Sequence, residues 1–208
     1  MSFRLEEKIK LHISDLNKVR SHLQFINAKE LYPKRKISSI YFDNKFFEMY
    51  RDSEEGCVPR KKVRIRHYPE EKNPSKNLET KITSVEGKFK VNKKISSDLN
   101  NYYFKNGIFV QQYGNCDPVI KVSYTREYLI LKNCRFTIDY DIKYEGITFN
   151  KIFNDNETLV LELKSSNDII SNLNLFSDFI PMQRVRYTKY CEGINLLYNK
   201  PHQQRIYI

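Results

Sequence analysis

Alternating basic residues mark the segment Arg60–Tyr68, which reads RKKVRIRHY. Successive side chains of an extended strand point to opposite faces, so Lys62, Arg64 and Arg66 share one face and the apolar residues between them share the other. Arginine presents paired donors that match phosphate oxygens, and lysine adds a mobile positive charge. The segment therefore predicts a strand with one face suited to a phosphate-rich anion.

A second pattern, Glu-x-Lys, places one carboxylate and one lysine on the same face of a strand. It occurs as Glu6 and Lys8, as Glu79 and Lys81, and as Glu162 and Lys164. A solvated strand face would explain any single one of these segments. Long basic residues dominate the polar face of most of the predicted strands, however, and a few carboxylates among them suit an anion that is bound together with a metal ion.

The overall charge of the chain agrees with this interpretation. Its 208 residues include 36 Lys and Arg and 25 Asp and Glu, which gives a net charge of +11 at pH 7. Such a charge attracts nucleic acids, acidic membrane surfaces or phosphate-rich small molecules. We expect no nucleic-acid partner, because the basic residues follow strand faces and are not clustered with stacking aromatic residues.

The remaining composition bounds the class of protein. The four cysteines and four histidines show no metal-ligand spacing, so reduced thiols and a cytoplasmic location are expected. We find no signal-peptide pattern and no apolar run of the roughly 20 residues that a bilayer-spanning helix needs, so no membrane insertion is expected. The length suits a single domain over residues 1–208.

Hydrophobic periodicity predicts a fold of class α+β that is dominated by strands. Eight strands are expected at 3–12, 37–43, 61–68, 77–83, 87–94, 119–130, 134–142 and 158–165, and a ninth is weighed at 183–188. Helices are expected after a Ser14 cap and at 97–104, 168–179 and 194–198. Turn-forming residues predict loops at 69–77 and 113–118.

The two-faced strands constrain the architecture. If the charged faces line the inside of a closed antiparallel sheet, helices must cover the apolar faces outside, which inverts the usual filled barrel. Many like charges in a dry channel would be very unfavourable, so such a channel must hold water or an anion. The sequence therefore predicts a basic tunnel.

Eight short motifs occur in the same order in a known family. They are RLEEK at 4–8, IYFDN at 40–44, KVRIRHY at 62–68, LETK at 78–81, YTR at 124–126, RFTID at 135–139, LELK at 161–164 and TKY at 188–190. In these motifs the chain resembles the VTC (vacuolar transporter chaperone) domain of polyphosphate polymerases, within the triphosphate tunnel metalloenzymes. The resemblance implies a closed eight-stranded antiparallel β-barrel tunnel with flanking helices, which holds a triphosphate or a polyphosphate chain.

The resemblance also implies roles for individual residues. The residues expected to grip the reacting phosphates are Lys8, Arg64, Arg66, Lys81, Arg126, Arg135 and Lys189. Those expected to add substrate contacts are Tyr124, Lys62, Lys164, Thr188 and Arg4, together with Lys88 or Lys90. Glu162, and with it Glu6, is expected to bind Mn²⁺ or Mg²⁺ through carboxylate oxygens.

Three carboxylates also have structural readings. For Glu162 the alternative is a salt bridge to a tunnel lysine or arginine. A structural role is favoured for Asp139, which can pair with an arginine, and for Asp43, which lies where a strand gives way to a turn.

The first motif bears on the reaction. The hydrolytic branch of the superfamily carries Glu-x-Glu-x-Lys here, whereas this chain has Arg4-x-Glu6-x-Lys8. Transfer to a phosphate acceptor is therefore favoured over hydrolysis, and the expected activity is ATP-dependent polyphosphate polymerisation with ATP and inorganic polyphosphate as partners. A metal-dependent triphosphatase and a non-catalytic polyphosphate- or inositol-polyphosphate-binding module remain as alternatives, and a separate membrane-protein partner stays open.

Overall fold

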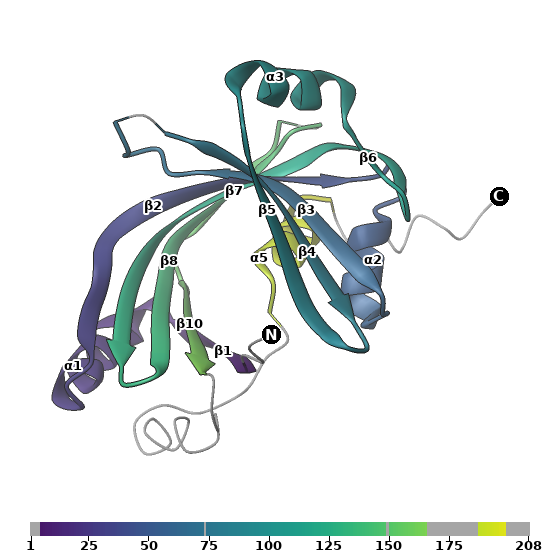
Figure 1. Ribbon diagram of the computed structural model, residues 1–208. Coiled ribbons are helices and arrows are strands. Elements are labelled where there is room, and N and C mark those ends of the chain that lie inside the picture. The colour runs from purple at the N-terminus through teal and green to yellow at the C-terminus, as the bar shows by residue number, and fades with distance from the viewer. Residues whose placement is uncertain (1–4, 73, 149, 166–186, 199–208) are drawn as a thin grey trace. The chain divides into compact units, whose positions relative to one another are not determined.

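A computed structural model describes residues 5–72, 74–148, 150–165 and 187–198. In these ranges the chain forms a β-dominated α+β fold with one large sheet and four α-helices (Figure 1). The strands are β1 Leu5–His12, β2 Lys29–Asp43, β3 Arg60–His67, β4 Lys76–Ser84, β5 Gly87–Ile95, β6 Ile108–Val110, β7 Gly114–Leu131, β8 Cys134–Gly146, β9 Ile152–Asp155 and β10 Thr158–Ser165. The helices are α1 Leu16–Phe25, α2 Glu48–Glu55, α3 Ser97–Asn106 and α5 Lys189–Tyr198, and a 3-10 turn covers Ile13–Asp15.

The strands are ordered β1-β10-β8-β7-β2-β3-β4-β5, with β6 paired to β7 and β9 paired to β8. The eight strands of the main path are the eight that alternation predicts. The pairs with a defined register are antiparallel. Within the described ranges no hydrogen-bonded pairing joins β1 to β5, so hydrogen bonds do not close the sheet into the expected barrel.

The chain divides into two compact units. The first unit comprises Met1–Lys36, Tyr124–Ile142 and Asp155–Tyr187, and the second comprises Ile37–Ser123, Lys143–Asn154 and Thr188–Ile208. The long strands β2, β7 and β8 contribute residues to both units. Each unit has its own hydrophobic core and its own charged strand face.

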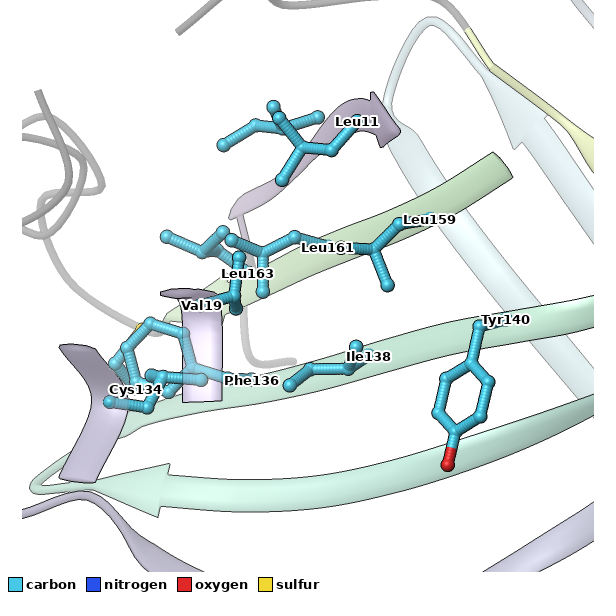
Figure 2. Close-up of a cluster of buried hydrophobic side chains, with 11 residues drawn as sticks. Leu11, Val19, Cys134, Phe136, Ile138, Tyr140, Leu159, Leu161 and Leu163 are labelled. Atoms are coloured by element: carbon cyan, nitrogen blue, oxygen red, sulfur yellow. The ribbon is translucent and has the colours of Figure 1, made fainter. Parts of the chain in front are cut away.

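In the first unit, helix α1 packs on the apolar face of β1, β8 and β10. Val19 and Leu23 of α1 are fully buried against Phe136 of β8 and Leu161 of β10. Figure 2 shows the side chains of β8, β10 and α1 gathered in this cluster. Full burial of an aliphatic or aromatic side chain contributes about 1.5–3 kcal/mol, so this layer fixes which face of the three strands is left for the charged residues.

In the second unit, the apolar face of β2 and β3 is covered by α2 and α3. Phe42 and Val63 are buried together with Met49 of α2. Leu99 and Tyr103 of α3 pack against the same cluster. The prediction that helices cover the apolar strand faces is therefore confirmed within each unit.

Helix α2 is absent from the sequence prediction, and Asp43 explains its position. Oδ1 of Asp43 accepts a hydrogen bond from the backbone N–H of Met49 at 3.0 Å, and Oδ2 accepts one from Tyr50 at 2.9 Å. Oδ2 also accepts from the hydroxyl of Tyr190 at 2.5 Å. The fully buried Asp43 thus satisfies donors at the start of α2, which confirms the structural reading of this carboxylate.

Several predicted boundaries are wrong or fall outside the described residues. Ser14 does not cap α1, because it lies within the 3-10 turn and donates its backbone N–H to Nδ1 of His12. Residues 114–118 begin strand β7 and are not a loop, since β6 pairs with 114–116. The helix predicted at 168–179 lies outside the described residues, as do residues 183–186 of the possible strand at 183–188.

Candidate phosphate-binding faces

In the second unit, β3, β4 and β5 lie side by side (Figure 1) and place basic residues in register on one face. Lys62 of β3 is directly opposite Lys81 of β4, which is directly opposite Lys90 of β5. Like charges at opposite positions destabilise a sheet. A row of three lysines therefore marks a surface whose repulsion an anion would relieve.

One carboxylate, Glu79, is embedded among these cations. Its Oε2 accepts a hydrogen bond from Nε of Arg64 at 2.7 Å, and its Oε1 is 2.5 Å from Nζ of Lys90. Arg64 also donates through Nη1 to the hydroxyl of Tyr41 at 2.9 Å. Glu79 is 4% exposed and Arg64 is 8% exposed, so this cluster holds the guanidinium in a fixed position.

Arg66 is positioned in the same way by the neighbouring strand. Its Nε donates to Oγ of Ser39 on β2 at 3.0 Å, and the arginine is 8% exposed. Burial alone would raise the pKa of the Tyr41 hydroxyl, but the charges of Arg64, Arg66 and Lys62 outweigh burial and lower it. A lowered pKa of a buried tyrosine indicates a strongly positive local potential, because positive charges stabilise the deprotonated phenol.

The register also assigns Lys88 and Lys90. Lys88 is opposite Thr83 and Lys90 is opposite Lys81, so both belong to the charged face. Lys90 is the one that reaches Glu79 at the centre of the cluster, whereas Lys88 lies near the β4–β5 hairpin. Lys90 is therefore the better match for the single basic position that the resemblance implies.

Helix α5 begins at the same group of residues. Thr188 accepts a hydrogen bond at Oγ1 from the backbone N–H of Cys191 at 3.1 Å, so it acts as a cap for the helix. Lys189 is the first helical residue. The ring of Tyr190 stacks on Tyr41, with centroids 5.0 Å apart. Thr188 and Lys189 are thus fixed through α5 to the strand that carries Tyr41.

The ion pairs of Glu79 predict an acid-dependent loss of stability. Burial would raise its pKa, but Arg64, Arg66 and the Lys90 hydrogen bond lower it from 4.5 to about 2. Because the folded-state pKa is depressed, the stabilisation is complete above pH 4.5 and is lost as the pH falls from 4.5 through 2. A shift of this size corresponds to about 3 kcal/mol.

Urea unfolding at several pH values checks this expectation. The free energy of unfolding of Glu79→Gln should be below that of the unchanged protein at pH 7, and the difference should shrink as the pH falls below 4.5. Glu71→Gln in the exposed β3–β4 connection is the matched control. A difference that stays constant down to pH 3 would show that the ionised form of Glu79 contributes no stability.

In the first unit, two Glu-x-Lys segments face each other on antiparallel strands. Glu6 of β1 is opposite Lys164 of β10, and Lys8 is opposite Glu162. The antiparallel direction thus places each carboxylate opposite a lysine. Nζ of Lys164 is 2.6 Å from Oε1 of Glu162, and Nζ of Lys8 is 3.2 Å from Oε1 of Glu6. The pattern that the sequence shows as two separate motifs is one four-residue charge grid.

Glu162 is the buried centre of this grid. It is 6% exposed, and burial would raise its pKa. The charges of Lys8, Lys164 and Arg126 nevertheless hold the pKa of Glu162 well below its usual range, so it is ionised at neutral pH. Nη2 of Arg126 lies 3.7 Å from Oε2 of Glu162. The structural salt-bridge interpretation of Glu162 therefore has a geometric basis.

Asp139 confirms its predicted pairing with an arginine. Its two oxygens are 2.5 Å from Nε and 2.7 Å from Nη2 of Arg126, a bidentate pair. The guanidinium also lies over the ring of Tyr124, 5.3 Å from the centroid. Arg126 is thus oriented from two sides, and Tyr124 shares its surroundings.

The predicted site residues fall into two groups that belong to different units. The first unit holds Lys8, Glu6, Tyr124, Arg126, Arg135, Glu162 and Lys164, and the second holds Lys62, Arg64, Arg66, Lys81, Lys88, Lys90, Thr188 and Lys189. Arg4 lies outside the described residues. Sequence reasoning missed Ser39 and Tyr41, although both have the strand parity of Asp43 and could have been found as the polar positions of β2.

A family model described as the VTC domain matches residues 3–198. The chain belongs to the VTC domain family. It is thereby a member of a phosphoryl-transfer family with a triphosphate-tunnel type of fold. No curated protein sequence matches this VTC domain.

Solved structures with the same fold are distant in sequence. A candidate adenylate cyclase from Bacillus halodurans is 11% identical, with a TM-score of 0.61 and coverage of 95% of this chain and 100% of the other. The PH1819 protein from Pyrococcus horikoshii is 13% identical, with a TM-score of 0.58 and coverage of 92% and 99%. A conserved protein of unassigned function from Pyrococcus furiosus is 16% identical, with a TM-score of 0.55 and coverage of 91% and 100%. At these identities the likeness extends to the fold alone.

The donor set of the VTC domain fits a divalent cation of the hard, oxygen-binding kind. Glu162 is ionised, and Glu6 lies on the same strand face. Among the described residues no group of three or more His, Cys, Asp and Glu side chains is placed to hold a metal ion. Mg²⁺ is commonly bound by one or two carboxylates together with water and substrate phosphates, and the two glutamates match that arrangement.

The helices in the described part of the chain are too short or too polar to span a membrane.

Proposed function

We propose that this VTC domain is an ATP-dependent polyphosphate polymerase, which transfers the γ-phosphoryl group of ATP to the end of a polyphosphate chain and releases ADP. The observation that carries the proposal is the lysine row of the second unit, Lys62, Lys81 and Lys90 in register beside buried Arg64 and Arg66. A repeated row of cations suits a repeated row of phosphates. Glu79 is the central carboxylate of this face and is outnumbered by the three lysines and two arginines, so the net charge of the face is positive.

The reacting groups explain why cations suffice. The terminal oxygen of a polyphosphate chain is already anionic, so no side chain has to remove a proton from it. The barrier comes from bringing two polyanions together, and positioned charges lower it. Arg64 and Arg66 would hold non-bridging oxygens through paired donors, while lysines of the row neutralise neighbouring phosphates.

In the first unit, Arg126 and Lys8 would bind phosphate oxygens, and Glu162 and Glu6 would hold the divalent cation. A bound Mn²⁺ or Mg²⁺ supplies charge neutralisation at phosphate oxygens. Arg126 is fixed by its bidentate pair with Asp139, so it can contribute a donor without first losing side-chain freedom. Tyr124 would contact the nucleotide beside Arg126.

The preference for transfer over hydrolysis rests on the first motif. Position 4 is arginine, where the hydrolytic branch has a carboxylate that helps to activate water. We further propose that the sheet closes into a tunnel around the phosphate chain.

Incubation with ATP and Mn²⁺ tests the function directly. The products are resolved by length on a gel, and ADP and free orthophosphate are measured in parallel. We expect a ladder of polyphosphates and one ADP for each phosphate incorporated, with orthophosphate as a minor product. Heat-inactivated protein and a reaction without metal serve as controls.

The alternatives give different products. Stoichiometric orthophosphate without a ladder would identify a triphosphatase. Tight binding of polyphosphate without either product would identify a binding module. Either result would overturn the polymerase proposal.

A further inference from the structure

Thr137 is a buried residue on the charged face of β8. Its neighbours Phe136 and Ile138 point into the hydrophobic cluster of the first unit, as Figure 2 shows. Strand alternation therefore places Thr137 on the opposite face, together with Arg135 and Asp139. Thr137 is 4% exposed. It is thus a buried polar residue among charged ones, outside the hydrophobic core.

The hydroxyl of Thr137 is unsatisfied. Its Oγ1 is buried and has no hydrogen-bond partner among the described residues. Buried hydroxyls are nearly always hydrogen-bonded, because burial without a partner costs free energy. Valine has the same shape and would avoid this cost. A buried threonine whose hydroxyl is unpaired indicates that a ligand supplies the partner.

The residues around Thr137 indicate the charge of that ligand. Arg135, two positions away on the same face, is directly opposite Lys164 on β10, which is a like-charged pair. Within the described part of the chain, the Arg135 side chain takes part in no ion pair. Thr137 itself is opposite Glu162, whose carboxylate is held by Lys164. Lys164 is therefore compensated by a carboxylate, whereas Arg135 is not paired with one among the described residues.

We propose that Thr137 is a substrate-binding residue, whose hydroxyl donates a hydrogen bond to a phosphoryl oxygen that Arg135 also binds. The inference deepens the proposed function, because it takes the ligand to be a condensed phosphate. It adds a neutral donor to a site built from charges. Such a donor requires a directed lone pair at hydrogen-bond distance, so it selects phosphate position, whereas Lys164 attracts any nearby anion.

Binding of tripolyphosphate to the full chain tests this role without requiring turnover. Affinity is measured by calorimetry in buffer freed of divalent metals, for the unchanged protein, Thr137→Val and Thr137→Ser. Loss of a hydrogen bond to a charged group lowers affinity by about tenfold or more, so we expect that loss for Thr137→Val. Thr137→Ser retains the hydroxyl and should bind within about threefold of the unchanged protein.

The melting temperature without ligand separates this role from a structural one. If the hydroxyl is reserved for a ligand, Thr137→Val should melt at the same or a higher temperature than the unchanged protein. Arg135→Ala combined with Thr137→Val should cost less affinity than the two single losses added together, since both residues contact one oxygen. If Thr137→Val fails to fold, Thr137→Ala provides the same comparison with a smaller side chain.

Two results would overturn the inference. Tripolyphosphate binding by Thr137→Val that equals the unchanged protein would show that the hydroxyl is not used, and the proposed function would stand. Failure of the unchanged protein to bind tripolyphosphate at all would remove the proposed function together with the role of Thr137. The two failures are therefore distinguishable in one experiment.

Discussion

Replacing Arg64 and Arg66 together by alanine should reduce polyphosphate synthesis by a factor of about 10² to 10⁴. Hydrogen bonds to charged groups are worth roughly 1.5–3 kcal/mol each, and each arginine is expected to hold phosphate oxygens of the same chain. Both side chains are buried and fixed by neighbours, Arg64 by Glu79 and Arg66 by Ser39. Lysines nearby cannot reproduce the two parallel donors of a guanidinium. The double change should therefore cost more than either single change.

The measurement is the initial rate of ladder formation from ATP, with tripolyphosphate affinity measured in parallel. Lys61→Ala combined with Lys93→Ala is the matched control. This control removes two positive charges, as the arginine double change does. Lys61 of β3 and Lys93 of β5 are paired in register with Ile82 and Leu78, so they lie on the sheet face opposite to the lysine row. Synthesis that survives the arginine double change, or an equal loss in the lysine control, would contradict a site on this face.

Glu162→Gln should strongly lower metal-dependent turnover and, at the same time, strengthen metal-free binding of tripolyphosphate. The two effects have opposite signs because the carboxylate of Glu162 is expected both to bind the metal ion and to neutralise nearby cations. Its carboxylate is expected to hold the divalent cation, and it also neutralises Lys164 and Arg126 in the absence of ligand. The amide retains the shape but has no charge, so the metal loses a ligand, while the phosphates lose a negative charge that would repel them.

We expect turnover to fall by about 100-fold or more, since a lost charged contact costs up to about 3 kcal/mol. Binding of Mn²⁺ in the presence of a non-hydrolysable ATP analogue, followed by electron paramagnetic resonance, should be lost in parallel. Thermal unfolding verifies that the variant folds, because a broken buried ion pair destabilises. Normal metal dependence in Glu162→Gln would reassign the residue to the structural ion pair with Lys164.

The strands were predictable because each one has a charged face and an apolar face. Alternation found β3, β4, β5 and β10 to within one or two residues. It missed the first half of β2, Lys29–Lys36, since the sequence KELYPKRK is polar and mostly exposed on both faces. It also missed the start of β7, where Asn115 and Pro118 are turn-forming residues within a strand. Alternation in the sequence predicts a strand only where one face of the strand is buried and the other is exposed.

Helix α2 shows a second limit. Its sequence EMYRDSEE has little apolar periodicity, and its first N–H groups are satisfied by Asp43, six and seven positions earlier. A cap at that distance has no local sequence signal, because ordinary capping residues act on donors two or three positions later. The helix therefore depends on tertiary structure for its start.

The sequence predicted which residues belong to the candidate site, but it did not predict which of them form ion pairs with one another. The residues Arg64, Lys81 and Glu162 follow from strand parity and from the family resemblance. That Glu79 would hold both Arg64 and Lys90 depends on the register of three strands, which is fixed by hydrogen bonds and turns. Thr137 was overlooked, since a threonine in a strand is unremarkable until its hydroxyl is known to be buried and unpaired.

The pairing of β1 with β10 has a consequence for how cells make this protein. Strand β1 ends at His12, and the strand that it pairs with begins at Thr158. At 5–20 residues per second a ribosome needs about 7–30 s to reach that partner. Throughout this time Ile9 and Leu11, which end up buried, stay without their strand partner on the nascent chain. Yield in the cell should therefore depend on chaperones that shield this first strand, even when the finished fold is stable.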